Sequence, residues 1–294
     1  MRFFRSYISL QKESNSYIVI VFSKIILGGS KMDILLVFGV ITGLLAVVVG
    51  MIVKGANVAV LLNPAAAIII LVGTCAAVMN SFPMKEFSNI PKLFGALFRG
   101  GKGEDPTLVI EEIIEIAQET RKNGILSLEG KIQNMDNEFM KHGLEMVVDG
   151  LEPDYIREVL EYEITSREDR HRSGALVFTT AGGAAPTLGV LGAVIGLIGA
   201  LGNLNDTEKL GHMIAAAFVA TLYGIFFGYV ICHPFATRLK RKSHEEVGIM
   251  NIMLEGILAI QEGKNPKSIQ SKLLAMLKPK DRNKFEENSK NELE

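Results

Sequence analysis

The stretch GALVFTTAGGAAPTLGVLGAVIGLIGAL, residues 174–201, contains no charged side chain. It is longer than the roughly 20 residues that an α-helix needs to cross the hydrocarbon core of a bilayer. Residues 34–53, 55–84 and 210–237 also lack Asp, Glu, Lys and Arg. Four uncharged runs of this length exclude a soluble single-domain enzyme. They predict an all-α, polytopic membrane protein with four transmembrane helices, at about Ile34–Val53, Asn63–Phe82, Gly174–Leu201 and Leu210–Phe235.

Charged residues gather in the two remaining parts of the 294-residue chain. Residues 85–173 hold 12 Lys/Arg and 19 Asp/Glu, and the residues after 236 hold 12 Lys/Arg and 9 Asp/Glu. The formal net charge is −1, which does not indicate a nucleic-acid partner. The predicted organisation is an N-terminal extension (1–31), transmembrane helices 1–2 (32–83), a cytoplasmic helical loop (84–173), transmembrane helices 3–4 (174–236) and a cytoplasmic tail (237–294).

Loop charges predict how the chain crosses the membrane. The short loops 54–62 and 202–209 carry one basic residue each, Lys54 and Lys209, whereas a basic cluster, 238–242, directly follows the fourth span. Basic residues beside spans stay on the cytoplasmic side. We therefore expect both termini and the large loop in the cytoplasm, and the spans in the lipid of the cell membrane.

The first 31 residues do not fit a span or a cleaved leader. Their apolar part, 17–27, is short, and no small-residue cleavage site precedes Asp33. Met32 directly abuts the first span and resembles a natural start. We therefore hypothesise that Met32 is the initiator.

The charged parts show helical periodicity. Asp105-Pro106 is an N-cap followed by a proline suited to the first helical position. The apolar stripe Val109, Ile113, Ile116, Ala117 comes next. A break at Asn123-Gly124 precedes an expected helix over 125–140, and Pro153 opens a third helix that is expected to run into span three. In the tail, residues 252–260 and the stripe Ile269, Leu273, Leu277 are also expected to be helical.

No catalytic or metal-binding constellation is present in the sequence. The five histidines lack metal-ligand spacing: His142, His171, His212, His233 and His244. The phosphate-loop pattern GxxxxGK[ST] is missing, and the two cysteines, Cys75 and Cys232, imply no disulfide framework. We expect neither an enzyme nor a bound cofactor.

Span three is rich in glycine and alanine, and it contains Pro186. Its small residues, among them Gly192 and Gly196, serve either ordinary packing within one bundle or an inner wall for a helix of another chain. The ring of Pro186 takes the carbonyl of Gly182 out of the helical ladder and is expected to bend the helix. Thr221 in span four either bonds its own helix or offers a hydroxyl at depth.

No carboxylate lies inside any span. An ion pathway through a membrane normally needs an ionisable group at depth. If this chain moves ions, a partner must supply that group.

Three separated motifs stand out along the spans and the tail: AFVATLYGIFFGYVICHP at 217–234, APTLGVLGAVIGL at 185–197 and LEGILAIQEGKNP at 254–266, preceded by MDILLVFGVITGL at Met32. Together they resemble the MotA family of flagellar motor stator subunits. The resemblance covers about residues 32–278. It implies a homopentamer around a dimer of a MotB-type protein, whose transmembrane Asp binds the coupling ion, and a cytoplasmic loop that contacts the rotor (C-ring) protein.

The resemblance also assigns individual residues. Pro186 and Pro234 match the family's span-three proline and the proline that ends span four. Thr221, followed by Tyr223, matches the threonine that faces the ion site, so the resemblance implies an ion pathway along Pro186, Ala193, Thr221 and Tyr223. RKNGILSLEGKI at 121–132 matches the rotor-contacting segment, which places Arg121 and Glu129 on its paired charges; Glu163 is a third match.

One position bears on the coupling ion. Sodium-driven relatives carry a threonine seven residues after the span-three proline, and here that position is Ala193. Sodium must collect several oxygen ligands, whereas a proton needs only a carboxylate and a path to it. We therefore expect proton coupling. Two alternatives to a flagellar stator remain open: an energising subunit similar to ExbB or TolQ, and a membrane scaffold that transports nothing.

Overall fold

The computed structural model describes residues 34–98 and 104–291, and the side chains up to residue 286. No β-strand occurs in these ranges, so the all-α prediction is confirmed. Four helical stretches in the described residues are long and apolar enough to cross a membrane, also as predicted. The hypothesis that Met32 is the initiator concerns residues outside the described ranges.

The first two spans lie where the uncharged runs placed them. Helix α2 covers Ile34–Val53, the 3₁₀ turn η1 covers Val58–Leu61, and helix α3 covers Pro64–Ser81. Asn63 caps α3, because its side-chain oxygen accepts the N–H of Ala66 at 3.0 Å. Pro64 then occupies the first helical position, where its missing N–H costs nothing.

Two short helices come after α3 and attach it to the third span. Helix α4 covers Met84–Phe87 and helix α5 covers Ile90–Phe98. The hydroxyl of Ser173 donates to the carboxylate of Glu86 at 2.9 Å. Phe94 meets Phe178 edge to face at a ring-centroid distance of 5.2 Å, a favoured aromatic geometry.

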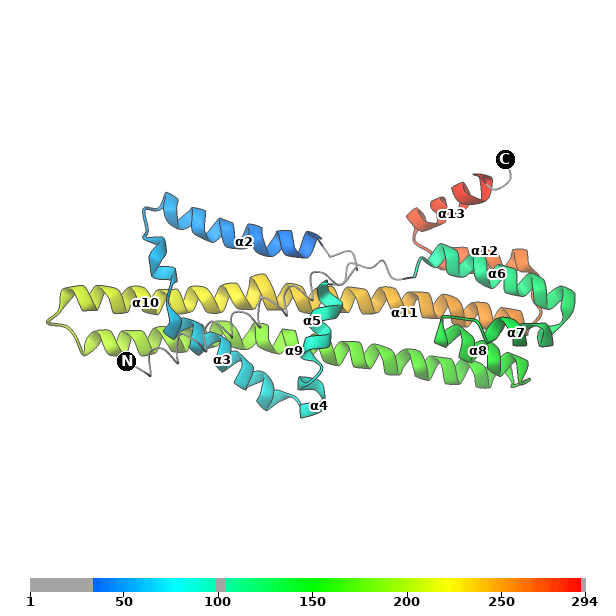
Figure 1. The fold of residues 1–294 in the computed structure, drawn as a ribbon, viewed down its shortest axis with the longest axis horizontal. Coiled ribbons are helices and arrows are strands. Elements are labelled where there is room, and N and C mark those ends of the chain that lie inside the picture. Colours follow the sequence, from blue (N-terminus) through cyan, green and yellow to red (C-terminus); the bar gives the residue numbers. More distant parts are fainter. Residues whose placement is uncertain (1–33, 99–103, 292–294) are drawn as a thin grey trace, which may run out of the picture. The chain divides into compact units, whose positions relative to one another are not determined.

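Two long helical runs contain the third and fourth spans (Figure 1). Helix α9 is unbroken over Pro153–Leu201, so the predicted fusion of the 153 helix with span three is confirmed. Helix α10 (Thr207–Ile225), the π-helical segment η3 (Phe226–Cys232) and helix α11 (His233–Gln261) form the second run. Asp206 caps α10, because its carboxylate accepts the N–H of Lys209 at 3.0 Å.

The described chain separates into two compact units. The membrane unit comprises 34–98 with 173–239, and the second, charged unit comprises 104–172 with 240–291. The charged unit contains helix α6 (Pro106–Asn123), the 3₁₀ turn η2 (Ile125–Leu128), helices α7 (Glu129–Ile132), α8 (Glu138–Val148), α12 (Pro266–Met276) and α13 (Pro279–Asn291), and parts of α9 and α11.

The predicted apolar stripes form the core of the charged unit. On α6, Ile110, Ile113 and Ile116 are fully buried. They pack in one cluster with the buried residues of α8, α9, α11 and α12, including the predicted Ile269, Leu273 and Leu277. Burying each such side chain stabilises the fold by about 1.5–3 kcal/mol.

One expected helix is wrong. The single helix expected over 125–140 is instead η2, α7 and the start of α8, with residues 133–137 between them. Asn137 is the physical reason, because its side chain accepts the N–H of Met140 at 2.9 Å and starts a new helix there. The break predicted at Asn123-Gly124 is confirmed by the end of α6 at Asn123 and by φ +83° at Gly124.

Candidate functional site

The membrane unit is built around a backbone contact between α9 and α10. A Cβ added at Gly224 on α10 would lie 2.4 Å from the carbonyl oxygen of Ala185 on α9. A Cβ added at Gly189 on α9 would lie 3.0 Å from the carbonyl oxygen of Ala220. Only glycine allows backbones to approach this closely, so these two positions fix how the helices cross.

The same contact also involves two of the span-three glycines that stand out in the sequence. A Cβ at Gly192 would lie 2.8 Å from Cβ of Ala220, and one at Gly196 would lie 2.8 Å from Cβ of Ala217. Both glycines therefore face α10 of their own chain. For Gly192 and Gly196 these contacts support packing within the chain's own helix pair; an inner wall of span three for a helix of another chain stays a prediction.

Pro186 lies beside this contact, and α9 stays helical on both sides of it. Proline has no N–H, so the carbonyl of Gly182 loses its helical donor. Gly228 of η3 fits against both groups. A Cβ there would lie 2.6 Å from the Gly182 oxygen and 2.9 Å from Cδ of Pro186. The proline ring and the released carbonyl thus form one face of the site.

Thr221 joins the two helices through its hydroxyl. Its Oγ1 donates to the carbonyl oxygen of Gly189 at 3.4 Å, so the partner is on α9 and is not a carbonyl of its own helix. Gly189 lies one turn from Pro186 and one turn from Ala193 along α9. The structure therefore brings Thr221 together with the stretch between Pro186 and Ala193; that these residues line an ion pathway stays a prediction.

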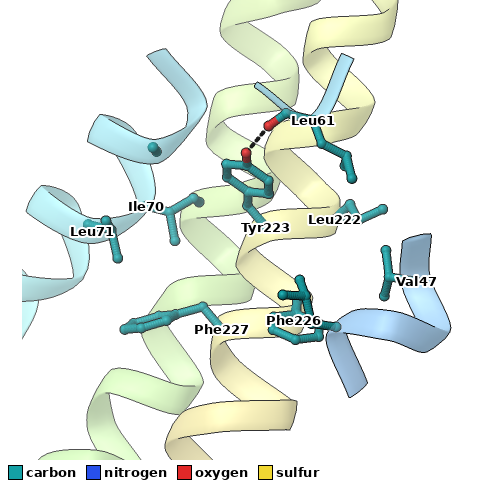
Figure 2. A pocket seen from close by; sticks show the side chains of 10 residues that line it. Val47, Leu61, Ile70, Leu71, Leu222, Tyr223, Phe226 and Phe227 are labelled. Atoms are coloured by element: carbon teal, nitrogen blue, oxygen red, sulfur yellow. Dashed lines mark hydrogen bonds between the residues drawn. The ribbon is translucent and has the colours of Figure 1, made fainter. Parts of the chain in front are cut away.

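Tyr223 lies elsewhere. It comes two residues after Thr221, which places it on another face of α10. Figure 2 shows its hydroxyl donating to the carbonyl of Leu61 in η1. The ring lines an apolar cavity of about 200 Å³ together with residues of α2 and α3, among them Val47 and Ile70. The structure does not bring Tyr223 together with Thr221 and Pro186; its hydroxyl attaches the α2–α3 connection to α10.

Pro234 lies at the predicted end of span four, and the helical run continues through it. It is the second residue of α11, which continues to Gln261. The reason is the preceding π-helical segment, in which the N–H of His233 donates to the carbonyl of Gly228, five residues back. Proline is tolerated in the first turn after such a change of hydrogen-bonding pattern, where a missing N–H disrupts little.

The residues predicted to contact the rotor lie in the charged unit. Arg121 stands in the last turn of α6, and Glu129 begins α7. Both side chains are exposed, and neither has a hydrogen bond or ion pair with another described residue. Glu163 differs, because its carboxylate is half-buried and contacts Arg167 and His142, each at 3.4 Å. The structure therefore leaves the first two available to a partner and engages the third internally.

Lys131 fixes the 121–132 segment to α6. Its ammonium contacts the carboxylates of Glu115 at 2.6 Å and Glu119 at 3.5 Å. Partial burial lowers the pKa of Lys131, but these two carboxylates outweigh the burial and leave the pKa raised. Lys131 therefore stays charged at any physiological pH, and the backbone that carries Glu129 is held in place.

Sequence reasoning missed a cavity beside Arg121. Its volume is about 460 Å³, and it lies between residues 117–126 and 260–264. The sequence offered a signal, since Gly124 and Gly263 each follow a predicted helix, and glycine readily adopts the positive φ that both have in the structure. As for metals, no group of three or more His, Cys, Asp or Glu side chains in the described ranges could hold an ion.

Comparison with known proteins agrees with this arrangement. The family model of the MotA/TolQ/ExbB proton channel family matches residues 131–252. Motility protein A of Bacillus subtilis (strain 168) is 50% identical over 260 residues, which cover 87% of this chain and 95% of that protein.

Two solved structures share the fold. The flagellar MotAB stator complex from Bacillus subtilis matches with a TM-score of 0.80 at 50% identity, over 85% of this chain and 98% of that chain. The C. jejuni MotAB structure matches with a TM-score of 0.80 at 30% identity, over 84% and 97%. By fold, sequence and the geometry of its spans, this chain is a multi-pass membrane protein that belongs to the MotA/TolQ/ExbB proton channel family.

Proposed function

We propose that this chain is the stator subunit of a bacterial flagellar motor, which converts an ion-motive force into torque on the rotor. The observation that carries the proposal is the α9–α10 contact. It holds the Thr221 hydroxyl and the released Gly182 carbonyl among uncharged spans. The likeness to the two MotAB structures supports it. The role is transport and mechanical work, and we propose no covalent catalysis and no cofactor.

The absence of a carboxylate from the spans determines which group the partner must supply. None of the four spans contains Asp or Glu, so the titrating group at depth must come from another chain. We propose five copies of this chain around a dimer of a single-span MotB-type protein, whose membrane-embedded Asp binds the ion near Thr221 and Pro186. Ion flux rotates the pentamer about that partner, and the charged unit, on the cytoplasmic side, passes torque to the rotor through Arg121 and Glu129.

A gene deletion tests the function. Deleting the gene should abolish swimming while leaving flagellar filaments in place, and a plasmid copy should restore swimming. The tagged chain should copurify with a single-span protein that carries an Asp in its span. Normal swimming after deletion would instead favour a subunit similar to ExbB or TolQ. Purification without such a partner would favour a scaffold.

We further propose that the coupling ion is the proton. Thr221 is the hydroxyl that contacts α9 at the site, and Ala193 supplies no second oxygen. Removing an oxygen ligand from a tight sodium site costs about 1–3 kcal/mol by analogy with burying an uncompensated polar group. A proton has no such requirement.

Swimming speed at fixed pH against external sodium tests this assignment. We expect the speed to stay constant when potassium replaces sodium, provided that the proton-motive force is held. A collapse of speed on sodium removal would assign the coupling to sodium and would leave the stator function intact.

A further inference from the structure

Two helices of the charged unit end at the cavity beside Arg121. Helix α6 leaves through Gly124, with φ +83°, and α11 leaves toward Gly263, with φ +64°. The cavity between residues 117–126 and 260–264 has a volume of about 460 Å³, and we name it the helix-end groove. Ligand pockets occupy about 300–1,000 Å³, so the groove has room for side chains of a partner segment.

The groove has an apolar wall that is left in water. Ile260 is buried, at 3% exposure, whereas Leu126 is 70% exposed and Ile125 is 36% exposed. All three line the cavity. Large aliphatic side chains exposed beside a cavity are typical of interaction sites, because a partner can remove them from water.

The rim of the groove is basic. Arg121 and Lys264 line it, and no acidic residue of the described chain does. Lys264 already contacts Glu262 at 3.2 Å, whereas Arg121 has no ion pair or hydrogen bond within the described ranges. Its guanidinium therefore remains available to a carboxylate, which it can bind with two parallel hydrogen bonds.

We propose that the helix-end groove docks an amphipathic segment of the rotor protein that presents a large aliphatic side chain next to a carboxylate. The proposal rests on the proposed function, since it takes the 121–132 segment as the rotor contact. The aliphatic side chain packs between Leu126 and Ile260, and Arg121 binds the carboxylate at the rim. The contact thus has two parts. Salt screens the charged part, whereas it does not screen the apolar part.

Two exposed leucines of the charged unit provide a matched pair of variants. Leu126→Ala removes the wall of the groove. Leu108→Ala removes a side chain that is 61% exposed in the first turn of α6 and does not line it. Binding of purified rotor protein to the purified complex with its MotB-type partner is measured at about 0.1 M and about 0.5 M salt. We expect Leu126→Ala to weaken binding about tenfold at both salt concentrations and Leu108→Ala to bind like wild type.

Two further variants separate packing from folding and from charge. Leu126→Gln keeps the side-chain length and should weaken binding as much as Leu126→Ala. Leu126→Met keeps an apolar side chain and should bind like wild type. Arg121→Gln should weaken binding mainly at low salt. Copurification of the partner with each variant shows that the complex is assembled.

The outcomes separate this proposal from the proposed function. If the wild-type complex binds rotor protein and the two alanine variants bind equally well, the docking role of the groove is overturned and the stator function stands. If the wild-type complex binds no rotor protein at either salt concentration and deletion of the gene leaves swimming unchanged, the stator function itself fails.

Discussion

Gly224 is the residue at which α9 and α10 meet backbone to backbone. Any side chain there would lie 2.4 Å from a carbonyl oxygen of the neighbouring helix, and backbone atoms in a packed helix pair cannot move aside cheaply. Thr221, one turn earlier, adds a hydrogen bond across the same contact. At the residue scale, the site therefore depends on small side chains and one hydroxyl.

Gly224→Ala should destabilise the assembled complex by at least the 1–3 kcal/mol typical of overpacking, because the added methyl meets backbone. The amount of complex recovered from membranes and its melting temperature measure the effect. Gly211→Ala is the control, since Gly211 lies on the same helix in open space and alanine favours helix by about 1 kcal/mol. Equal stability of the two variants would contradict the backbone contact.

Arg121 and Glu129 are exposed charges, and each exposed contact contributes about 1 kcal/mol or less. Neutralising either one should therefore reduce swimming only in part, whereas Arg121→Glu combined with Glu129→Lys should reduce it severely through like-charge repulsion. Swimming speed and stall torque are the measurements. A double reversal that swims normally would remove both residues from the rotor contact.

At the scale of elements, two local features determine how helices begin or pack: a proline inside α9 and a side-chain N-cap at the start of α6. Pro186 keeps the Gly182 carbonyl out of the helical ladder, and Gly228 packs on both groups. Asp105 caps α6 by accepting the N–H of Thr107 at 3.2 Å and forms an ion pair with Lys284 of α13.

Pro186→Ala should give a complex that assembles in the membrane but turns poorly. The new N–H returns the Gly182 carbonyl to the ladder, and the ring contact with Gly228 is lost. Rotation of single motors and copurification of the partner measure the two properties separately. Thr187→Ala, at the exposed next residue, should behave like wild type. Loss of assembly in Pro186→Ala would mean that the proline is only structural.

The Asp105 cap should make the charged unit sensitive to acid. The hydrogen bonds from Lys284 and Thr107 lower the pKa of Asp105 from 3.8 to about 2. Because the folded pKa is the lower one, the stabilisation is complete above about pH 4 and is lost as pH falls toward 2. Asp105→Asn keeps the cap and removes the ion pair.

The test compares melting temperatures of the purified full-length protein and Asp105→Asn across this range. The wild type should melt slightly higher than the variant at pH 5, because the ion pair is then formed but lies at the surface, where solvent screens it. The two curves should meet near pH 2. A difference that stays constant with pH would exclude the ion pair as its source.

At the scale of the whole molecule, the features set by hydrophobicity and by helix caps were predictable from the sequence. They include the four spans, the start of α6 at Asp105 and the buried stripe of α6, because each is a local pattern of one residue type. The family resemblance singled out Thr221 and Pro186 separately, and the structure adds the contact of Thr221 with the Gly189 carbonyl, one turn from Pro186.

The features of the fold and the site that could not be predicted depend on contacts between segments far apart in the chain. Nothing near Tyr223 in sequence indicates that its hydroxyl meets Leu61. The helix-end groove exists only because residues 117–126 and 260–264 come together. The π-helical segment could not be predicted from the sequence either. Seven consecutive apolar residues such as 226–232 do not distinguish i→i+5 from i→i+4 backbone hydrogen bonding.

That π-helical segment has a consequence for changes in chain length. Each of its hydrogen bonds spans one residue more than an α-helical bond, so the segment holds a residue that a regular helix would not need. A one-residue deletion inside 226–232 therefore tightens the coil locally and leaves the side chains of α11 on their present faces. The same deletion within α10 would turn every later side chain of the run by about 100°. In the fourth span, η3 is therefore the segment in which one residue can be deleted without changing which faces the α11 side chains occupy.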